Sequence, residues 1–158
     1  MRRVLGVDPG SLRTGYGIVD VRGNSVTPVA WGVIRLDCEE SFPDRLLRIH
    51  SELSALISRH RPTEASVEKV FLAKNASSAL KLGQARGAAI VTCRALGLAV
   101  HEYSAKEIKA AATGYGAAPK EQVAGMIARL LGIRETLPPD ATDALAMAFC
   151  RAVTRDLS

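Results

Sequence analysis

Four acidic residues lie where the surrounding sequence predicts burial. Asp8 ends an apolar segment, and Glu68 lies between apolar residues in ASVEKVF. Asp140 and Asp143 are three residues apart in PPDATDALAMAFC, a spacing that places both on one face of a helix. Carboxylates are rarely buried unless they are paired or bind a cation. The four acids are therefore candidates for one shared metal site.

Oxygen ligands of this kind suit Mg²⁺ or Mn²⁺, whereas the sequence has no histidine and cysteine set of the type that binds zinc. Two such ions about 4 Å apart can activate a water and stabilise the leaving oxygen in phosphodiester hydrolysis. The net charge of +5 and the pI near 9.4 favour an anionic partner such as nucleic acid. A basic protein with an acidic pocket indicates a metal-dependent nuclease.

Each acid also has a purely structural explanation. Asp8 precedes Pro9 and Gly10, and aspartate is common in turns. Glu68 could point outward from an edge strand. Asp140 could be a favourable charge in the first turn of a helix, with Asp143 as its neighbour. Each alternative explains one acid, but together they require four unrelated acids to lie beside apolar faces by coincidence.

The elements around these acids predict an α/β fold. Residues 3–7, 15–21 and 25–36 read as three antiparallel strands, and residues 65–71 and 98–103 as two later strands. Helices are predicted over residues 42–61, 75–96, 104–113, 119–132 and 138–154, with Pro119 as a first helical residue. This order predicts a mixed five-stranded sheet with helices on both faces. With 158 residues and no evident linker, we expect residues 1–158 to form a single domain.

The sequence also indicates a compartment. Cys38, Cys93 and Cys150 form no CxxC pair, so neither a disulfide framework nor a thiolate zinc site is supported. Asp8 interrupts the first apolar run too early for a signal peptide. No run approaches the roughly 18 apolar residues that a membrane helix needs. We therefore expect a cytoplasmic protein with no membrane partner.

Three segments resemble one known family. LGVDPGSLRTGYG, VEKVF followed by LAKNASSALKLGQARG, and the late DATDALAMA are similar to the RuvC family of Holliday junction resolvases. The likeness runs almost from end to end, in order and at the family's spacings. LAKNASSALKLGQARG is long and highly specific. The DPG turn alone is less specific, because actin-like ATPases and sugar kinases use a similar acidic turn for phosphate.

The resemblance implies a ribonuclease H-like fold and a homodimer that makes paired nicks in four-way DNA junctions during recombination and repair. The products would carry 5′-phosphate and 3′-hydroxyl ends, and the family acts with the RuvA–RuvB branch-migration complex. The implied catalytic and metal-binding residues, serving two Mg²⁺ or Mn²⁺ ions, are Asp8, Glu68, Asp140 and Asp143. The implied DNA-binding residues are Phe71, Lys109 and Lys120. Lys74, a cation close to Phe71 in the sequence, is a further DNA-binding candidate.

Some features leave alternatives open. Many relatives have glutamine where this chain has Lys69, so an extra cation follows Glu68. Ala79, Gly83 and Gly87 form a stripe of small residues that would serve either packing within the monomer or a two-fold dimer interface. The other functions considered are an RNA nuclease, an ATPase or kinase using the Asp8 turn, and a junction-binding module without catalysis.

Overall fold

The computed structural model describes residues 1–70 and 75–154, so the predicted DNA-binding residues Phe71 and Lys74 lie outside the described residues. Its elements follow the predicted order of three strands, a helix, a strand, a helix, a strand and three helices. The strands are β1 (Arg2–Asp8), β2 (Arg13–Arg22), β3 (Ser25–Arg35), β4 (Glu64–Glu68) and β5 (Ala99–Tyr103). The helices are α1 (Phe42–His60), α2 (Ala76–Ala95), α3 (Ala105–Thr113), α4 (Lys120–Leu130) and α5 (Pro139–Val153).

The five strands form one sheet in the order β3-β2-β1-β4-β5. β1 pairs antiparallel with β2, and β2 with β3, whereas β1–β4 and β4–β5 are parallel pairs. The predicted mixed sheet is confirmed. Glu68 lies on an internal strand, so the edge-strand explanation for this acid is wrong. Because β1 and β4 are parallel neighbours, Asp8 and Glu68 end both strands at the same edge of the sheet.

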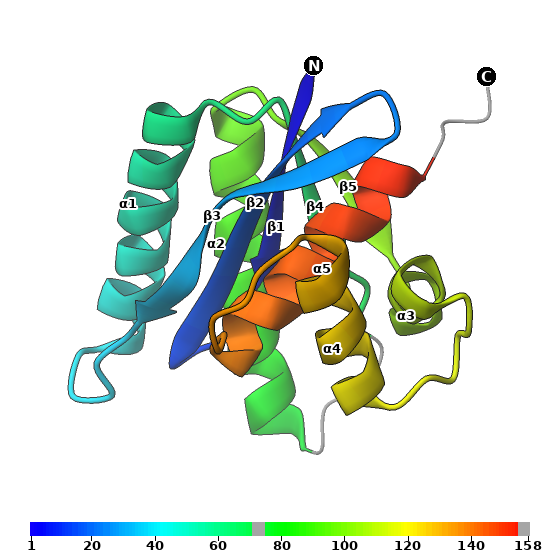
Figure 1. The fold of residues 1–158 in the computed structure, drawn as a ribbon. Coiled ribbons are helices and arrows are strands. Elements are labelled where there is room, and N and C mark those ends of the chain that lie inside the picture. Colours follow the sequence, from blue (N-terminus) through cyan, green and yellow to red (C-terminus); the bar gives the residue numbers. More distant parts are fainter. Residues whose placement is uncertain (71–74, 155–158) are drawn as a thin grey trace.

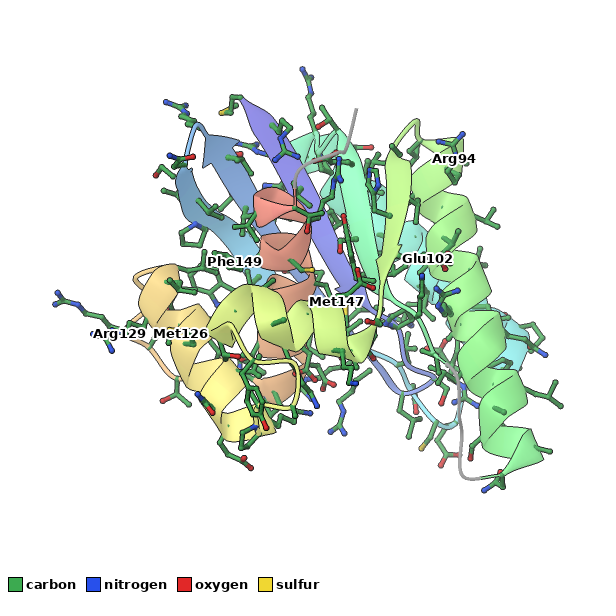
Figure 2. All side chains as sticks on the ribbon, turned by 90° about the vertical axis from the view of Figure 1, so that its right-hand side faces the viewer. Arg94, Glu102, Met126, Arg129, Met147 and Phe149 are labelled. Carbon is green, nitrogen blue, oxygen red and sulfur yellow. The ribbon has the colours of Figure 1, made fainter. Side chains whose placement is uncertain are left out.

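Helices cover both faces of the sheet, as predicted (Figure 1). α1 and α2 lie on one face, where Leu5 and Val7 of β1 pack with Ile49 and Leu53 of α1. α3, α4 and α5 lie on the other face, where Val4 packs among their buried side chains. Figure 2 looks onto this second layer, and the labelled Met147 and Phe149 of α5 belong to its core. Alternating residues of β1 thus belong to two separate hydrophobic cores, one on each face of the sheet.

α5 rests directly on the backbone of β1 and β2. A Cβ atom added at Gly6 would lie 1.9 Å from the carbonyl oxygen of Ala144, and one at Gly15 would lie 2.0 Å from that of Asp140. Both distances are far below van der Waals contact, so only glycine permits this approach. The glycines of the first hairpin therefore set how close the two acids of α5 come to the end of β1.

Side chains of β4 hold α5 in place. The buried hydroxyl of Ser66 donates a hydrogen bond of 2.7 Å to the carbonyl oxygen of Met147. Toward the helix end, the Glu64 carboxylate accepts from Arg151 at 3.2 Å and from Arg2 at 2.7 Å. The Arg151 guanidinium also donates to the Tyr103 hydroxyl at 3.2 Å. Because these polar groups are buried or half-buried and mutually satisfied, they fix the position of α5 along the sheet.

The helix ends agree with their sequence signals, except that Pro119 and Pro138 are N-caps and not helical residues. Asn75 caps α2 by accepting from the amide of Ser78 at 2.8 Å, and Ser104 forms the predicted capping box with Glu107. Pro119 was predicted as a first helical residue, but it is the N-cap of α4. Its backbone is extended, with φ −62° and ψ 151°, while its carbonyl accepts from the amides of Gln122 and Val123.

All three cysteines are free. Cys38 is exposed in the segment between β3 and α1, whereas Cys93 and Cys150 are buried. Burial disfavours the thiolate and raises the pKa of both buried thiols to about 11. In the part of the chain that the structure describes, no helix combines the length and apolar character needed to cross a membrane.

The close packing of α5 on β1 can be tested with Gly6→Ala. The added methyl group collides with the Ala144 carbonyl, so we expect the free energy of unfolding to fall by at least about 1–3 kcal/mol. Urea denaturation measures the change. Gly125→Ala is the matched control, because its added methyl group meets open space on α4 and should raise stability by about 0.5–1 kcal/mol. Equal effects of the two substitutions would contradict the proposed close approach.

Candidate active site

Three of the predicted acids line one cavity. Asp8 comes from the end of β1, Glu68 from the end of β4 and Asp143 from the first half of α5. The predicted Lys109 of α3 and Lys120 of α4 line the same cavity, which has a volume of about 280 Å³. Residues far apart in sequence thus meet because the parallel strands end together and α5 crosses above them. The cavity combines a negative floor with two cations from the helical layer.

Asp140 lies beside this cavity rather than in its wall. Its carboxylate is 3.4 Å from the Nε atom of Arg13, at the start of β2. Asp143 is instead paired with Lys120, whose Nζ atom lies 3.2 Å from its carboxylate. The two acids of α5 therefore face cations on opposite sides, one on a strand and one on a helix.

Burial and mutual repulsion perturb the acids. The pKa of Asp8 rises from 3.8 to about 7, first because the carboxyl group is buried and then because Asp143, Asp140 and Glu68 lie near it. Burial also raises the pKa of Glu68, with a further contribution from Asp143. The charges of Asp143, Asp140 and Glu68 therefore all act on Asp8, and a divalent cation would relieve the repulsion among the four acids.

The side chains do not yet converge as ligands. Within residues 1–70 and 75–154, no three acidic, histidine or cysteine side chains form a ready coordination group. Asp140 is instead paired with Arg13, and Asp143 with Lys120. The donor set still fits Mg²⁺ or Mn²⁺, because it is made of carboxylates alone and Asp8 is destabilised as an anion by its neighbours.

The turn after Asp8 is held by its own sequence and by α1. The buried Thr14 hydroxyl donates to the carbonyl oxygen of Gly10 at 3.2 Å and accepts from the Gly10 amide at 3.3 Å. Arg45 of α1 donates to the carbonyl oxygen of Ser11 at 3.0 Å, and its guanidinium lies 4.9 Å from the centre of the Phe42 ring. These contacts fix the backbone of the turn that follows Asp8 at the end of β1.

Lys69 extends the pairing of β4 beyond Glu68. Its amide donates to the carbonyl oxygen of Tyr103 at 2.8 Å. Its ammonium group contributes to the lowered pKa of Glu107, behind the two hydrogen bonds that Glu107 forms with Ser104. The extra cation therefore acts on the first turn of α3.

Sequence reasoning missed Arg13 and Arg45. Arg13 could have been found from the sequence. It precedes Gly15 by two residues, and alternate residues of a strand lie on the same face of the sheet. Arg45 could not have been found, since its contact with Ser11 joins residues far apart in the sequence.

Comparison with known proteins identifies the family. A sequence model described as crossover junction endodeoxyribonuclease RuvC matches residues 4–151. A RuvC protein from Methylococcus capsulatus is 54% identical over 150 residues, which cover 95% of this chain and 90% of that protein. One from Geobacter sulfurreducens is 53% identical over 150 residues, covering 95% of this chain and 92% of that protein. This chain belongs to the RuvC family.

Solved structures agree. Thermus thermophilus RuvC in complex with a Holliday junction substrate is 34% identical, has a TM-score of 0.91 and covers 96% of this chain and 93% of its own. The yeast mitochondrial Holliday junction resolvase Ydc2 is 14% identical with a TM-score of 0.68, and this likeness concerns the fold alone. The predicted ribonuclease H-like fold and the assignment to DNA-cleaving hydrolases of the RuvC family are confirmed. Membership of the RuvC family excludes the kinase and ATPase alternatives.

The raised pKa of Asp8 predicts a pH-dependent cost in the metal-free protein. Between about pH 4 and 7 the folded state holds a proton that the unfolded state releases, so the free energy of unfolding falls as the pH rises. Asp8→Asn removes this dependence. In urea titrations with EDTA, we expect Asp8→Asn to gain stability over the wild type at pH 8 and to gain less at pH 5. An equal gain at both pH values would contradict the assignment.

Proposed function

We propose that this protein resolves four-way DNA junctions by hydrolysing one phosphodiester bond in each of two opposed strands. Asp8, Glu68, Asp140 and Asp143 form its catalytic centre and hold two Mg²⁺ or Mn²⁺ ions. The observation that carries this proposal is the electrostatic convergence of four acids from β1, β4 and α5 on Asp8. No single-acid structural explanation accounts for that convergence.

Bound ions would activate a water and stabilise the leaving oxygen, giving 5′-phosphate and 3′-hydroxyl products. The protein's own contribution is position. Asp8 and Glu68 are fixed at the ends of paired strands, so their carboxylates hold one side of the centre. Asp140 and Asp143 approach from α5, whose register on the sheet is fixed by Ser66. The nonpolar wall of the cavity, including Ile108, Val123 and Met147, limits the entry of bulk water.

The lysines at the cavity have a second role. Lys120 is 69% exposed in its side chain and can leave Asp143 once an ion neutralises that carboxylate. Lys120 and Lys109 would then contact phosphate oxygens of the strand to be cut. Phe71 and Lys74 follow Glu68 closely in the sequence, and we assign them to DNA as an aromatic that stacks on an unpaired base and a cation beside it.

The partners follow from the family. The Thermus thermophilus relative was solved in complex with a Holliday junction substrate, which supports a four-way junction as the substrate here. We infer action alongside the RuvA–RuvB complex, in the cytoplasm, by a single nuclease domain spanning residues 1–158.

A homodimer would present two centres to the two equivalent strands of a junction. The outward face of α2 supports this arrangement. Leu80 and Val91 are each 66% exposed, and Cβ atoms added at Gly83 or Gly87 meet no atom within 4 Å. These residues lie three or four positions apart, so they form one apolar, shallow stripe against which a second helix can pack.

Cleavage of a synthetic four-way junction with Mg²⁺ or Mn²⁺ tests the catalytic proposal. We expect symmetric nicks in the junction and none in a linear duplex. Asp8→Asn should reduce the rate more than about 100-fold, because outer-sphere partners of metal ligands alone contribute about 10–100-fold. The matched control is Asp44→Asn, at the exposed first turn of α1. Junction binding without cleavage by the wild type would instead support a binding module.

Leu80→Glu tests the dimer. A charge at the first residue of the apolar stripe should convert the dimer to a monomer, as measured by light scattering after size-exclusion chromatography. Leu130→Glu is the control, because Leu130 is also exposed but lies on α4. A monomeric wild type, or a dimer that tolerates Leu80→Glu, would refute this interface.

A further inference from the structure

Two arginines face each other across β2 and β3 at the edge of the active site. The register of the two strands pairs Arg13 with Arg35. Both side chains are exposed, and like charges directly opposite in a sheet repel and destabilise the pair. The like-charged pair is therefore an unfavourable choice for folding.

A β-bulge produces this pairing. The register shifts between Ile18 and Val19, where the opposite strand moves from Ala30 to Pro28. Without the shift, Arg13 would lie opposite Ile34, and Arg35 would point to the other face of the sheet. Bulges often occur beside active sites, where they redirect a side chain.

Both arginines lie on the face that carries the acids. Gly15 and Gly17 of β2 contact α5 through Asp140 and Leu145, and alternate residues of a strand share a face. Arg13 therefore belongs to this face, and its pairing with Asp140 at 3.4 Å agrees. Arg35 shares it as the direct partner of Arg13, as does Trp31, which packs against the α5 core.

Two of the acids that follow Arg35 in the sequence have partners other than Arg35. In the segment after β3, the Asp37 carboxylate accepts from the amide of Glu39 at 2.9 Å, and Glu40 pairs with Arg48 at 2.5 Å. Among the described residues, the structure records no ion pair or hydrogen bond for the Arg35 side chain. The pair thus carries two positive charges, of which only Arg13 faces a carboxylate.

We propose that Arg13 and Arg35 form a clamp for the phosphate backbone of the DNA strand that enters the active site. This inference rests on the proposed function and adds a second basic wall to it. Lys109 and Lys120 lie on the helical side of the acids, and the arginine clamp lies on the sheet side. A phosphate between two guanidinium groups removes their repulsion, and arginine binds phosphate through two parallel hydrogen bonds. The Arg13 side chain is 62% exposed, so it can turn from Asp140 to a phosphate oxygen.

Junction binding in EDTA at several salt concentrations tests the clamp without cleavage. Each phosphate contact contributes about 0.9 to the slope of log affinity against log salt. We expect Arg13→Gln and Arg35→Gln each to reduce that slope by about 0.9 and to weaken binding about 5–10-fold near 0.1 M salt. The double variant should reduce the slope by about 1.8.

The control is Arg59→Gln, which removes the same charge in the last turn of α1, at the opposite end of the sheet from the acids. This variant should keep the wild-type slope. A second readout is thermal unfolding without DNA, where Arg35→Gln should melt at or above the wild-type temperature because it relieves repulsion. A lower melting temperature would overturn the inference, since Arg35 would then stabilise the strands.

The outcomes separate the two proposals. If the wild type binds and cuts junctions while Arg13→Gln and Arg35→Gln keep its salt slope, the clamp is refuted and the proposed function stands. A change in only one of the two variants also refutes a two-arginine clamp. If the wild type shows neither junction-selective binding nor cleavage, both proposals fail together.

Discussion

The direct packing of α5 on the first hairpin is the constraint on which this structure depends. Packed layers of secondary structure usually lie about 8–10 Å apart, separated by their side chains. Here Gly6 and Gly15 bring the helix backbone into contact with the strands. The approach positions Asp140 and Asp143 beside Asp8, so the electrostatics of the site follow from the packing of the core. A side chain at either glycine would separate the acids without altering any of them.

The same approach creates an electrostatic cost that the fold must offset. Four carboxylates near one another destabilise the folded state, as the raised pKa of Asp8 shows. The fold offsets part of this cost with two ion pairs, Arg13 with Asp140 and Lys120 with Asp143. It offsets more through the apolar cores on both faces of the sheet. In the metal-free protein, two of the acids proposed to bind metal are therefore paired with the chain's own basic residues.

The sequence predicted the elements well because their signals are local. Apolar periodicity, the Asn75 cap and the Ser104 capping box each depend on neighbouring residues. The acids were recognisable because they interrupt apolar faces. Pro28 indicated an edge or irregular strand, which the structure confirms, but the register that results and the contact of Gly6 with α5 depend on how distant segments meet. The Arg13–Arg35 pair was hidden for this reason: a one-residue register shift decides which side chains become neighbours.

The distribution of the three thiols makes this enzyme convenient for spectroscopy. Thiolate is the reactive form of cysteine, and burial keeps Cys93 and Cys150 protonated at neutral pH. Cys38 alone is exposed among them, three residues beyond Arg35 at the active-site end of β3. A maleimide dye would therefore attach at one defined place on the native protein without any engineered substitution. Paired with a dye on one arm of a junction, it would report by energy transfer which arm docks beside β3 and when that arm departs.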